Sequence, residues 1–343
     1  MAQSARAVSA TPSDESQSGH VKETLVSVII AFILAFVFRA FVIEAFIIPT
    51  GSMAPTLMGQ HMRFQGENTG YQWPVGPQFV YPGTNDPLPI QGGGGRLVTV
   101  HDPMSREEIN DSKGVARRAG DRILVFKYLY SIYDPKRFDV VVFKAPHEPQ
   151  QNYIKRLVGV PGEMIALVDG DVFARVPPAG EVTQPGSDTW SLPGWQIQRK
   201  PDRVQRSVWQ DVFSSEYQPL GGAQVRSVIA WPAGGTRPFH SPWLGNGNAW
   251  KIDGRTSYEY DGPGPATLTW DNQTTTAAET PFWTVVDFSY YNDTQNNNPQ
   301  GTAYAVSDVN MRCGIEPKSA PLDASAILRA RGHEFRADIT GTS

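Results

Sequence analysis

An apolar run of nineteen residues near the N-terminus limits what this chain can fold into more than any other feature. Residues 25–43 read LVSVIIAFILAFVFRAFVI, and Arg39 is their only charged residue. As a helix, such a run spans roughly 30 Å, the thickness of a bilayer's hydrocarbon core. Aliphatic and aromatic residues occur on every face, which favours a membrane span over a buried core helix. We therefore predict one transmembrane helix within residues 21–45.

The flanks of this run agree with a span that is retained. A cleaved signal peptide has a shorter apolar region that ends in a small-x-small site, and RAFVIEAF at 39–46 provides none. Residues 1–20 are rich in Ser, Ala and Gln without an apolar period, which predicts a disordered polar tail. The few basic residues on the two sides of the run nearly balance, and we take the N-terminus as cytoplasmic.

Composition excludes several kinds of function. A chain of 343 residues has room for two or three domains. Its net charge of -4 gives no reason to expect nucleic acid as a partner. Cys313 is the single cysteine, which rules out an intramolecular disulfide, and the six histidines have no ligand spacing. We therefore expect no metal and no other cofactor.

A serine follows the predicted span within a short distance. In FIIPTGSMAPTL, residues 46–57, two prolines exclude a regular helix, so Ser52 is expected on a bent, extended loop. Gly51 lacks the Cβ that would block a substrate backbone. Four apolar residues around Ser52 are expected to line shallow pockets: Phe46, Ile48, Met53 and Leu57. The alternative is an ordinary Pro/Gly/Ser turn, because a serine without a base has no special reactivity.

Residues 59–119 contain turn and loop signals with little periodicity, and we predict a loop-rich insertion there. The glycine run at 92–95 lacks the preceding strand and the Lys-Ser/Thr of a phosphate-binding loop, so a surface loop is favoured. Order returns in GDRILVFKYLY, residues 120–130, where alternating hydrophobics predict a strand.

A second informative stretch runs from residue 136 to residue 163. DVVVF at 139–143 and YIKRLVGV at 153–160 predict a hairpin, and PGE at 161–163 predicts a further turn. Strand alternation puts Lys155 on one face and Arg156 on the other, so one of the two cations faces a partly buried surface. A lysine held there would lose hydration, which lowers its pKa toward the range of a general base. The alternative is a lysine at a strand edge that deters aggregation.

Together these segments resemble bacterial type I signal peptidases, membrane-bound serine endopeptidases that remove signal peptides from exported proteins. The resemblance lies in FVIEAFIIPTGSMAPTL, GDRILVFKY, RFDVVVFKAP and NYIKRLVGVPGE, in that order after one span. It implies that Ser52 is the nucleophile, that Lys155 is the general base, and that the Thr50 hydroxyl and the Ser52 N–H form the oxyanion hole. It also implies substrate pockets for small residues at Ile48, Pro49, Met53, Leu57, Tyr153 and Ile154. The implied partners are signal peptides of exported preproteins and the lipid bilayer, with the catalytic domain, residues 46–163, on the extracytoplasmic side of the cell (inner) membrane.

One family feature has no match in this sequence. Signal peptidases close the catalytic sheet with a late motif resembling GDNRDNSxDSR, and no such motif occurs between residues 164 and 343. Two alternatives stay open: a chain cut short before that motif, or a divergent relative with weak or absent activity. In the second case the expected function is that of a membrane-tethered binding protein.

The remaining segment, residues 164–343, reads as a β-rich second domain. Short aromatic or β-branched runs separated by Gly, Pro and Asn turns predict a β-sandwich, inserted in or appended to the catalytic domain. Eight of the nine tryptophans lie here, and we expect them to anchor its core, with a face for an unknown ligand as the alternative. The predicted fold class is therefore mainly β, with an N-terminal transmembrane helix and an antiparallel β catalytic domain.

Overall fold

The computed structural model describes residues 14–76, 98–111, 118–181, 188–219, 224–226, 236–246, 249–253, 257–271, 285–295, 306, 308–318 and 321–341. The chain divides into two compact units, which we describe separately. Unit 1 comprises residues 1–47 and 122–135, and unit 2 comprises residues 48–121 and 136–343.

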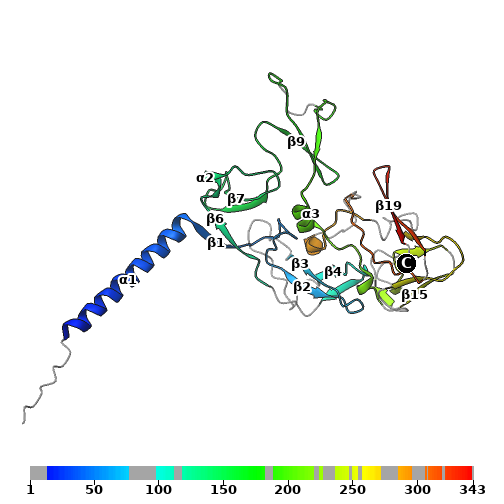
Figure 1. The fold of residues 1–343 in the computed structure, drawn as a ribbon, viewed down its shortest axis with the longest axis horizontal. Helices are drawn as coiled ribbons and strands as arrows, with labels where there is room; N and C mark the ends of the chain where they lie inside the picture. Colours follow the sequence, from blue (N-terminus) through cyan, green and yellow to red (C-terminus); the bar gives the residue numbers. More distant parts are fainter. Residues whose placement is uncertain are drawn as a thin grey trace, which may run out of the picture. The chain divides into compact units, whose positions relative to one another are not determined.

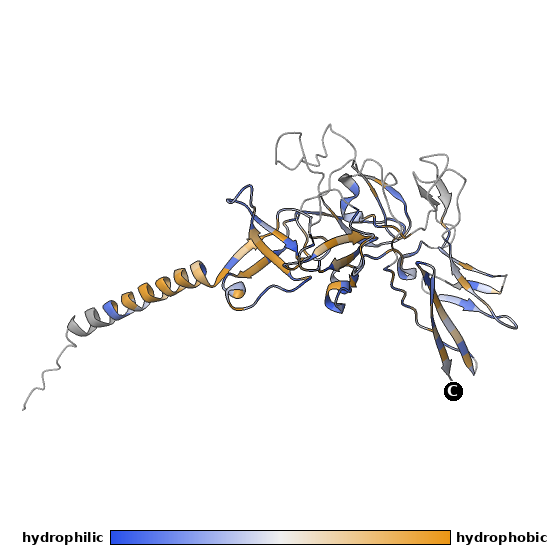
Figure 2. Cartoon of the chain, turned by 90° about the horizontal axis from the view of Figure 1, so that it is seen from above, coloured by the Kyte–Doolittle hydropathy of each residue, from blue (hydrophilic) through white to orange (hydrophobic). Residues whose placement is uncertain are grey.

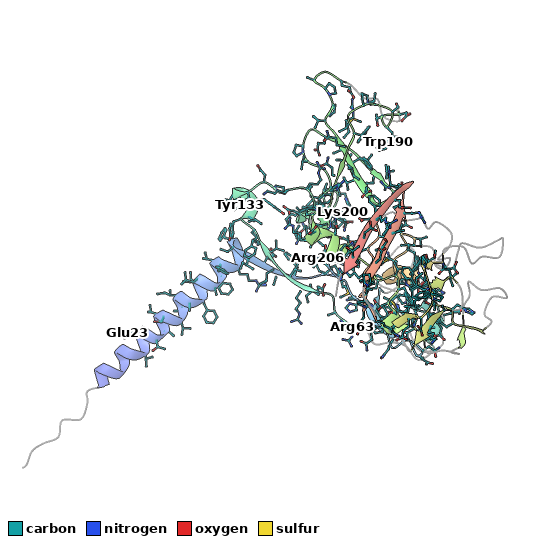
Figure 3. All side chains as sticks on the ribbon, turned by 45° about the vertical axis from the view of Figure 1, so that its right-hand side comes forward. Glu23, Arg63, Tyr133, Trp190, Lys200 and Arg206 are labelled. Atoms are coloured by element: carbon teal, nitrogen blue, oxygen red, sulfur yellow. The ribbon has the colours of Figure 1, made fainter. Side chains whose placement is uncertain are left out.

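Unit 1 begins with one long helix, α1 (Asp14–Phe41) (Figure 1). Its segment Val21–Phe41 is long and apolar enough to cross a membrane, and every side chain of this segment is exposed. Figure 2 shows this part of α1 as hydrophobic almost throughout, and Figure 3 shows side chains standing away from it on all sides from Glu23 onward. The helix includes residues 14–20 of the predicted disordered tail, while residues 1–13 of that tail lie outside the described residues.

A two-stranded sheet completes unit 1. Strand β1 (Ile43–Ile47) pairs antiparallel with β6 (Arg122–Phe126), and a short helix, α2 (Leu129–Ile132), follows. The strand predicted at residues 120–130 is thus present in its first half and gives way to a helical turn in its second. The Lys127 ammonium lies 2.9 Å from the Glu44 carboxylate, close to the end of α1.

Two hairpins in unit 2 occupy the region that we predicted to be loop-rich. They are β2 (Met62–Gln65) with β3 (Gln72–Val75), and β4 (Val98–His101) with β5 (Glu108–Asp111). Their inward side chains form one core cluster: Met62, Phe64, Trp73, Val75 and Val100. The prediction of loops missed these strands because each has only four residues and the intervening turns dominate the composition. The glycine run at 92–95 lies outside the described residues.

The predicted hairpin at 136–163 is present. Strand β7 (Val140–Lys144) pairs antiparallel with β8 (Asn152–Arg156), with Val141 opposite Lys155. A three-stranded antiparallel sheet follows, in the order β11 (Gln196–Gln198), β10 (Asp171–Arg175), β9 (Met164–Val168). A second core cluster joins Phe138, Val172 and Val204, the last of these from helix α3 (Asp202–Val208).

The rest of unit 2 is built from short antiparallel pairs. These are β12 (Gln224–Arg226) with β13 (Thr236–Pro238), β14 (Trp243–Gly245) with β17 (Leu268–Trp270), and β15 (Trp250–Asp253) with β16 (Ser257–Tyr260). The longest pair, β18 (Leu322–Ala330) with β19 (His333–Gly341), turns through Arg331 and Gly332, both at positive φ. The mainly β, antiparallel class is confirmed, and the packing of two sheets into a sandwich stays a prediction.

Two aromatic-rich segments of residues 164–343, where we predicted short strands, contain 3-10 helices. The first, η1 (Ser215–Tyr217), lies within residues 209–219 after α3, and the second is η2 (Tyr290–Gln295). Helix α3 follows Pro201 at its N-cap and begins at Asp202, an acidic residue that suits the N-terminal end of a helix dipole. The aromatic residues of both segments had favoured strands.

Candidate active site

The segment that carries Ser52 is a loop closed at its base by backbone hydrogen bonds. Ile48 N–H donates to Asp121 O at 2.9 Å, and Asp121 N–H donates to Met58 O at 2.8 Å. The Asp121 carboxylate accepts a further bond from Met58 N–H at 2.8 Å. Gln60 N–H donates to Pro49 O at 3.3 Å. These bonds fix where the loop starts and ends, independently of its side chains.

Within the loop the chain makes consecutive turns, as the two prolines predict. Ala54 N–H donates to Gly51 O at 2.9 Å, and Leu57 N–H donates to Met53 O at 2.9 Å. Met53 points inward with 8% of its surface exposed, whereas its neighbour Ser52 is exposed. The turns therefore present the serine hydroxyl at the surface of unit 2.

Lys155 of β8 reaches this hydroxyl. Its Nζ lies 2.7 Å from Ser52 Oγ and donates to it, and the same Nζ donates to Ile154 O at 3.1 Å. Nζ also lies 5.6 Å from the centre of the Tyr153 ring. Within the described part of the chain no carboxylate forms an ion pair with Lys155, so none competes with Ser52 for its amine.

One of the two adjacent cations faces a partly buried surface, as strand alternation predicted, and it is the arginine. Lys155 is exposed, and Arg156, on the other face of β8, is the partly buried one. Burial, together with the nearby positive charge of Arg203, lowers the pKa of Arg156. The face of β8 that turns toward the interior of unit 2 is therefore the arginine's, while the lysine's face is open to solvent.

Arg156 binds the Ser52 loop to its surroundings, a role that we did not predict. Its guanidinium donates to Thr56 Oγ1 at 2.8 Å and to Phe138 O at 3.0 Å. Thr56 Oγ1 in turn donates to Ser207 O at 2.9 Å. Strand alternation pointed to Arg156 as the opposite-face partner of Lys155, but nothing in the sequence near Ser207 pointed to this loop.

The two groups predicted to form an oxyanion hole are both free to bind. Thr50 is exposed, and it lies two residues before Ser52 in the same loop. In the described residues, neither the Thr50 hydroxyl nor the Ser52 N–H has a hydrogen-bond partner. Both donors are thus available to a developing negative charge next to Ser52.

The predicted pocket residues differ in their exposure. Ile48 and Met53 are buried, Leu57, Tyr153 and Ile154 are half-buried, and Pro49 is exposed. Tyr153 packs edge-on against Phe143 and His147. Phe46 is half-buried in β1, opposite Ile123, and belongs to unit 1. Their role as substrate pockets stays a prediction.

The described residues contain no candidate metal-binding site. Across the residues that the structure describes, no group of three or more His, Cys, Asp and Glu side chains is placed to hold a metal ion.

Comparison with known proteins matches this part of the chain to one family. The family model described as Signal peptidase, peptidase S26 matches residues 21–78 and 97–184. These residues include α1, the Ser52 loop and the β7–β8 hairpin. The matched region ends well before the short strand pairs of residues 224–341.

Several curated relatives carry the name Signal peptidase I. The protein from Rickettsia bellii (strain OSU 85-389) is 26% identical over 147 residues, which cover 43% of this chain and 37% of the relative. The protein from Buchnera aphidicola subsp. Baizongia pistaciae is 30% identical over 149 residues, 43% of this chain and 33% of the relative. The protein from Pseudomonas aeruginosa is 47% identical over 58 residues, 13% of this chain and 20% of the relative.

Each match covers only part of this chain and only part of the relative. The chain spans well under half the length of these curated relatives. No solved structure matches the chain. The family model covers the segment that holds the apolar helix, the serine loop and the lysine strand, and in this segment the chain is similar to the signal peptidase family, peptidase S26.

Proposed function

We propose that this chain is a membrane-bound serine endopeptidase that cleaves signal peptides from exported preproteins, with Ser52 as nucleophile and Lys155 as general base. The single observation that carries the proposal is the 2.7 Å separation of Lys155 Nζ and Ser52 Oγ. Similarity to signal peptidases supports the substrate class, because the curated relatives are named Signal peptidase I.

The reaction needs the amine in its neutral form. Neutral Lys155 accepts the hydroxyl proton while Ser52 Oγ attacks the carbonyl carbon of the scissile peptide bond. The resulting oxyanion accepts hydrogen bonds from the Ser52 N–H and the Thr50 hydroxyl, and one such donor typically stabilises the transition state by about 3 kcal/mol. Lys155 then gives its proton to the leaving amine, and the signal peptide remains as an ester on Ser52 until Lys155 activates a water to hydrolyse it.

The apolar helix determines where this chemistry takes place. Val21–Phe41 anchors the chain in the bilayer as a single span, and only the Ile43–Ile47 strand separates it from the loop of Ser52. A preprotein whose signal peptide lies in the same bilayer then presents its cleavage site close to the membrane surface. We place residues 46–163 on the extracytoplasmic side of the cell (inner) membrane, where exported proteins emerge.

Cleavage of an exported precursor by the detergent-solubilised full chain tests the proposal. Wild-type protein is expected to release the mature precursor, and Ser52→Ala to release none while still fractionating with membranes. Ser191→Ala removes another exposed serine hydroxyl, which donates to Asp188 O, and is expected to keep the wild-type rate. Wild-type cleavage by Ser52→Ala would refute the assignment of the nucleophile.

The exposure of Lys155 favours one alternative, a membrane-tethered binding protein without turnover. A water-exposed amine lacks the enclosed, apolar surroundings typical of a catalytic base. The same assay separates the two functions, because a binding protein leaves the precursor intact at every pH. Rising cleavage toward alkaline pH supports the peptidase instead.

A further inference from the structure

Tyr291 lies outside the residues matched by the family model, yet it contacts the Ser52 loop directly. It belongs to η2 (Tyr290–Gln295), and only 5% of its surface is exposed. A Cβ built on Gly51 would lie 2.0 Å from Cε1 of the Tyr291 ring. The ring therefore rests against the backbone of the residue immediately before Ser52.

The ring cannot move away easily. A Cβ built on Gly76 would lie 2.6 Å from the same ring carbon, so the ring edge fits between two glycines. Its hydroxyl donates to Gln60 O at 3.1 Å, and its backbone carbonyl accepts from Gly76 N–H at 2.7 Å. Burial raises the pKa of Tyr291 to about 12, so at neutral pH the hydroxyl is a donor.

The turn that carries Tyr291 is itself anchored. The buried Asp293 carboxylate accepts a hydrogen bond from the His101 backbone N–H and lies 3.1 Å from His101 Nδ1. Tyr290 packs on the core of the β2–β3 and β4–β5 hairpins, with the Arg106 guanidinium 5.1 Å from its ring centre. The position of Tyr291 is therefore determined by its neighbours on both sides.

This contact gives a different reason for the absence of a Cβ at residue 51. We expected its missing Cβ to leave room for a substrate backbone, and the structure fills that space with the Tyr291 ring. Glycine also lets the peptide between residues 51 and 52 rotate freely, and that peptide carries the Ser52 N–H. A buried ring packed on Gly51 opposes this rotation.

We propose that Tyr291 is a positioning residue for cleavage: its ring holds the Gly51–Ser52 peptide in the orientation that points the Ser52 N–H at the oxyanion and the hydroxyl at Lys155. The proposal rests on the proposed function. It gives η2, which lies outside the residues matched by the family model, a role in shaping the active site.

Steady-state kinetics of the full chain test this role. Tyr291→Ala is expected to lower kcat roughly 10–100-fold with KM within about twofold of wild type, because a misplaced catalytic group slows the chemical step without weakening binding. Tyr291→Phe keeps the ring and is expected to stay within about threefold of wild type. Tyr258→Ala removes a half-buried ring, whose hydroxyl lies 2.6 Å from Ser241 Oγ, and is expected to leave kcat unchanged.

Hydrogen exchange of the peptide that contains Gly51 and Ser52 gives a readout that needs no turnover. Faster exchange there in Tyr291→Ala, but not in Tyr258→Ala, supports the contact even if wild-type protein proves inactive, which would refute only the proposed function. If Tyr291→Ala does not fold, Tyr291→Leu fills the slot without the ring and is expected to show the same loss of kcat. Wild-type kcat and exchange in a folded Tyr291→Ala or Tyr291→Leu protein, with Ser52→Ala inactive, would overturn the inference.

Discussion

At the scale of single residues, Ser52 and Lys155 meet across 103 positions of sequence. The loop hydrogen bonds place the serine, the β7–β8 hairpin places the lysine, and Arg156 connects the two through Thr56. The geometry of the pair therefore depends on three independent supports. None of them requires a histidine or an acid near the lysine.

Substitution of the lysine by arginine separates a base from a mere cation. A guanidinium is not deprotonated in proteins, so Lys155→Arg is expected to be as inactive as Lys155→Ala, with kcat lowered roughly 10²–10⁴-fold. Lys144→Arg on the neighbouring strand, where Nζ only donates to Pro149 O, is the matched control and is expected to keep wild-type kcat. An active Lys155→Arg protein would mean that the base lies elsewhere.

At the scale of elements, the turn after β8 is held by a charged pair. Arg137 Nη2 donates to both Glu163 oxygens at 2.6 Å, and Glu163 also accepts from Val160 N–H at 3.2 Å. Both side chains are mostly buried. The hydrogen bonds from Arg137 lower the pKa of Glu163 below its ordinary value of 4.5.

This pair predicts a pH-dependent contribution to stability. Because the folded-state pKa of Glu163 is depressed, the stabilisation is present above pH 4.5 and is lost as pH falls through the lower, folded value. Glu163→Gln is expected to lower the free energy of unfolding by about 1–3 kcal/mol at pH 7. Urea titrations of both proteins at pH 7 and pH 3.5 check this, and an equal difference at both pH values would contradict it.

Local pattern predicted some elements and missed others for identifiable reasons. DVVVF and YIKR predicted the β7–β8 hairpin because β-branched residues dominate the first run and the second begins with the strand formers Tyr153 and Ile154. The β18–β19 hairpin was missed although Arg331 and Gly332 make a two-residue turn with positive φ, because its strands alternate small residues such as Ala324 and Ala326. The family resemblance, not periodicity, paired Ser52 with Lys155 as nucleophile and base. No local sequence pattern relates Tyr291 to Gly51.

At the scale of the whole molecule, the candidate membrane span and the β-rich parts of the chain have separate physical requirements. All side chains of Val21–Phe41 are exposed, which in water would leave a large apolar surface uncovered. The described tryptophans of the late segment are half-buried or exposed, and Trp73 of β3 is the one fully buried in the described residues. None of these six described tryptophans is fully buried, and their part in a core stays a prediction.

Charge in the middle of α1 tests the anchor. One arginine at the bilayer centre costs about 2.5–3.5 kcal/mol on insertion, so Ile30→Arg with Ile33→Arg is expected to release the chain from alkali-washed membranes. Val21→Arg with Leu25→Arg carries the same charge at the end of the span, where long side chains reach the interface, and is expected to stay bound. Retention of the central double variant in the membrane pellet would contradict a transmembrane α1.

Acid-quenched mass spectrometry during precursor cleavage tests the central claim most directly. The account predicts a signal-peptide ester on the peptide that contains Ser52, formed by the wild-type chain and absent from Ser52→Ala and Lys155→Ala. The ester should appear before free signal peptide accumulates. An adduct on a different residue, or undiminished cleavage by Ser52→Ala, would contradict the Ser52–Lys155 mechanism.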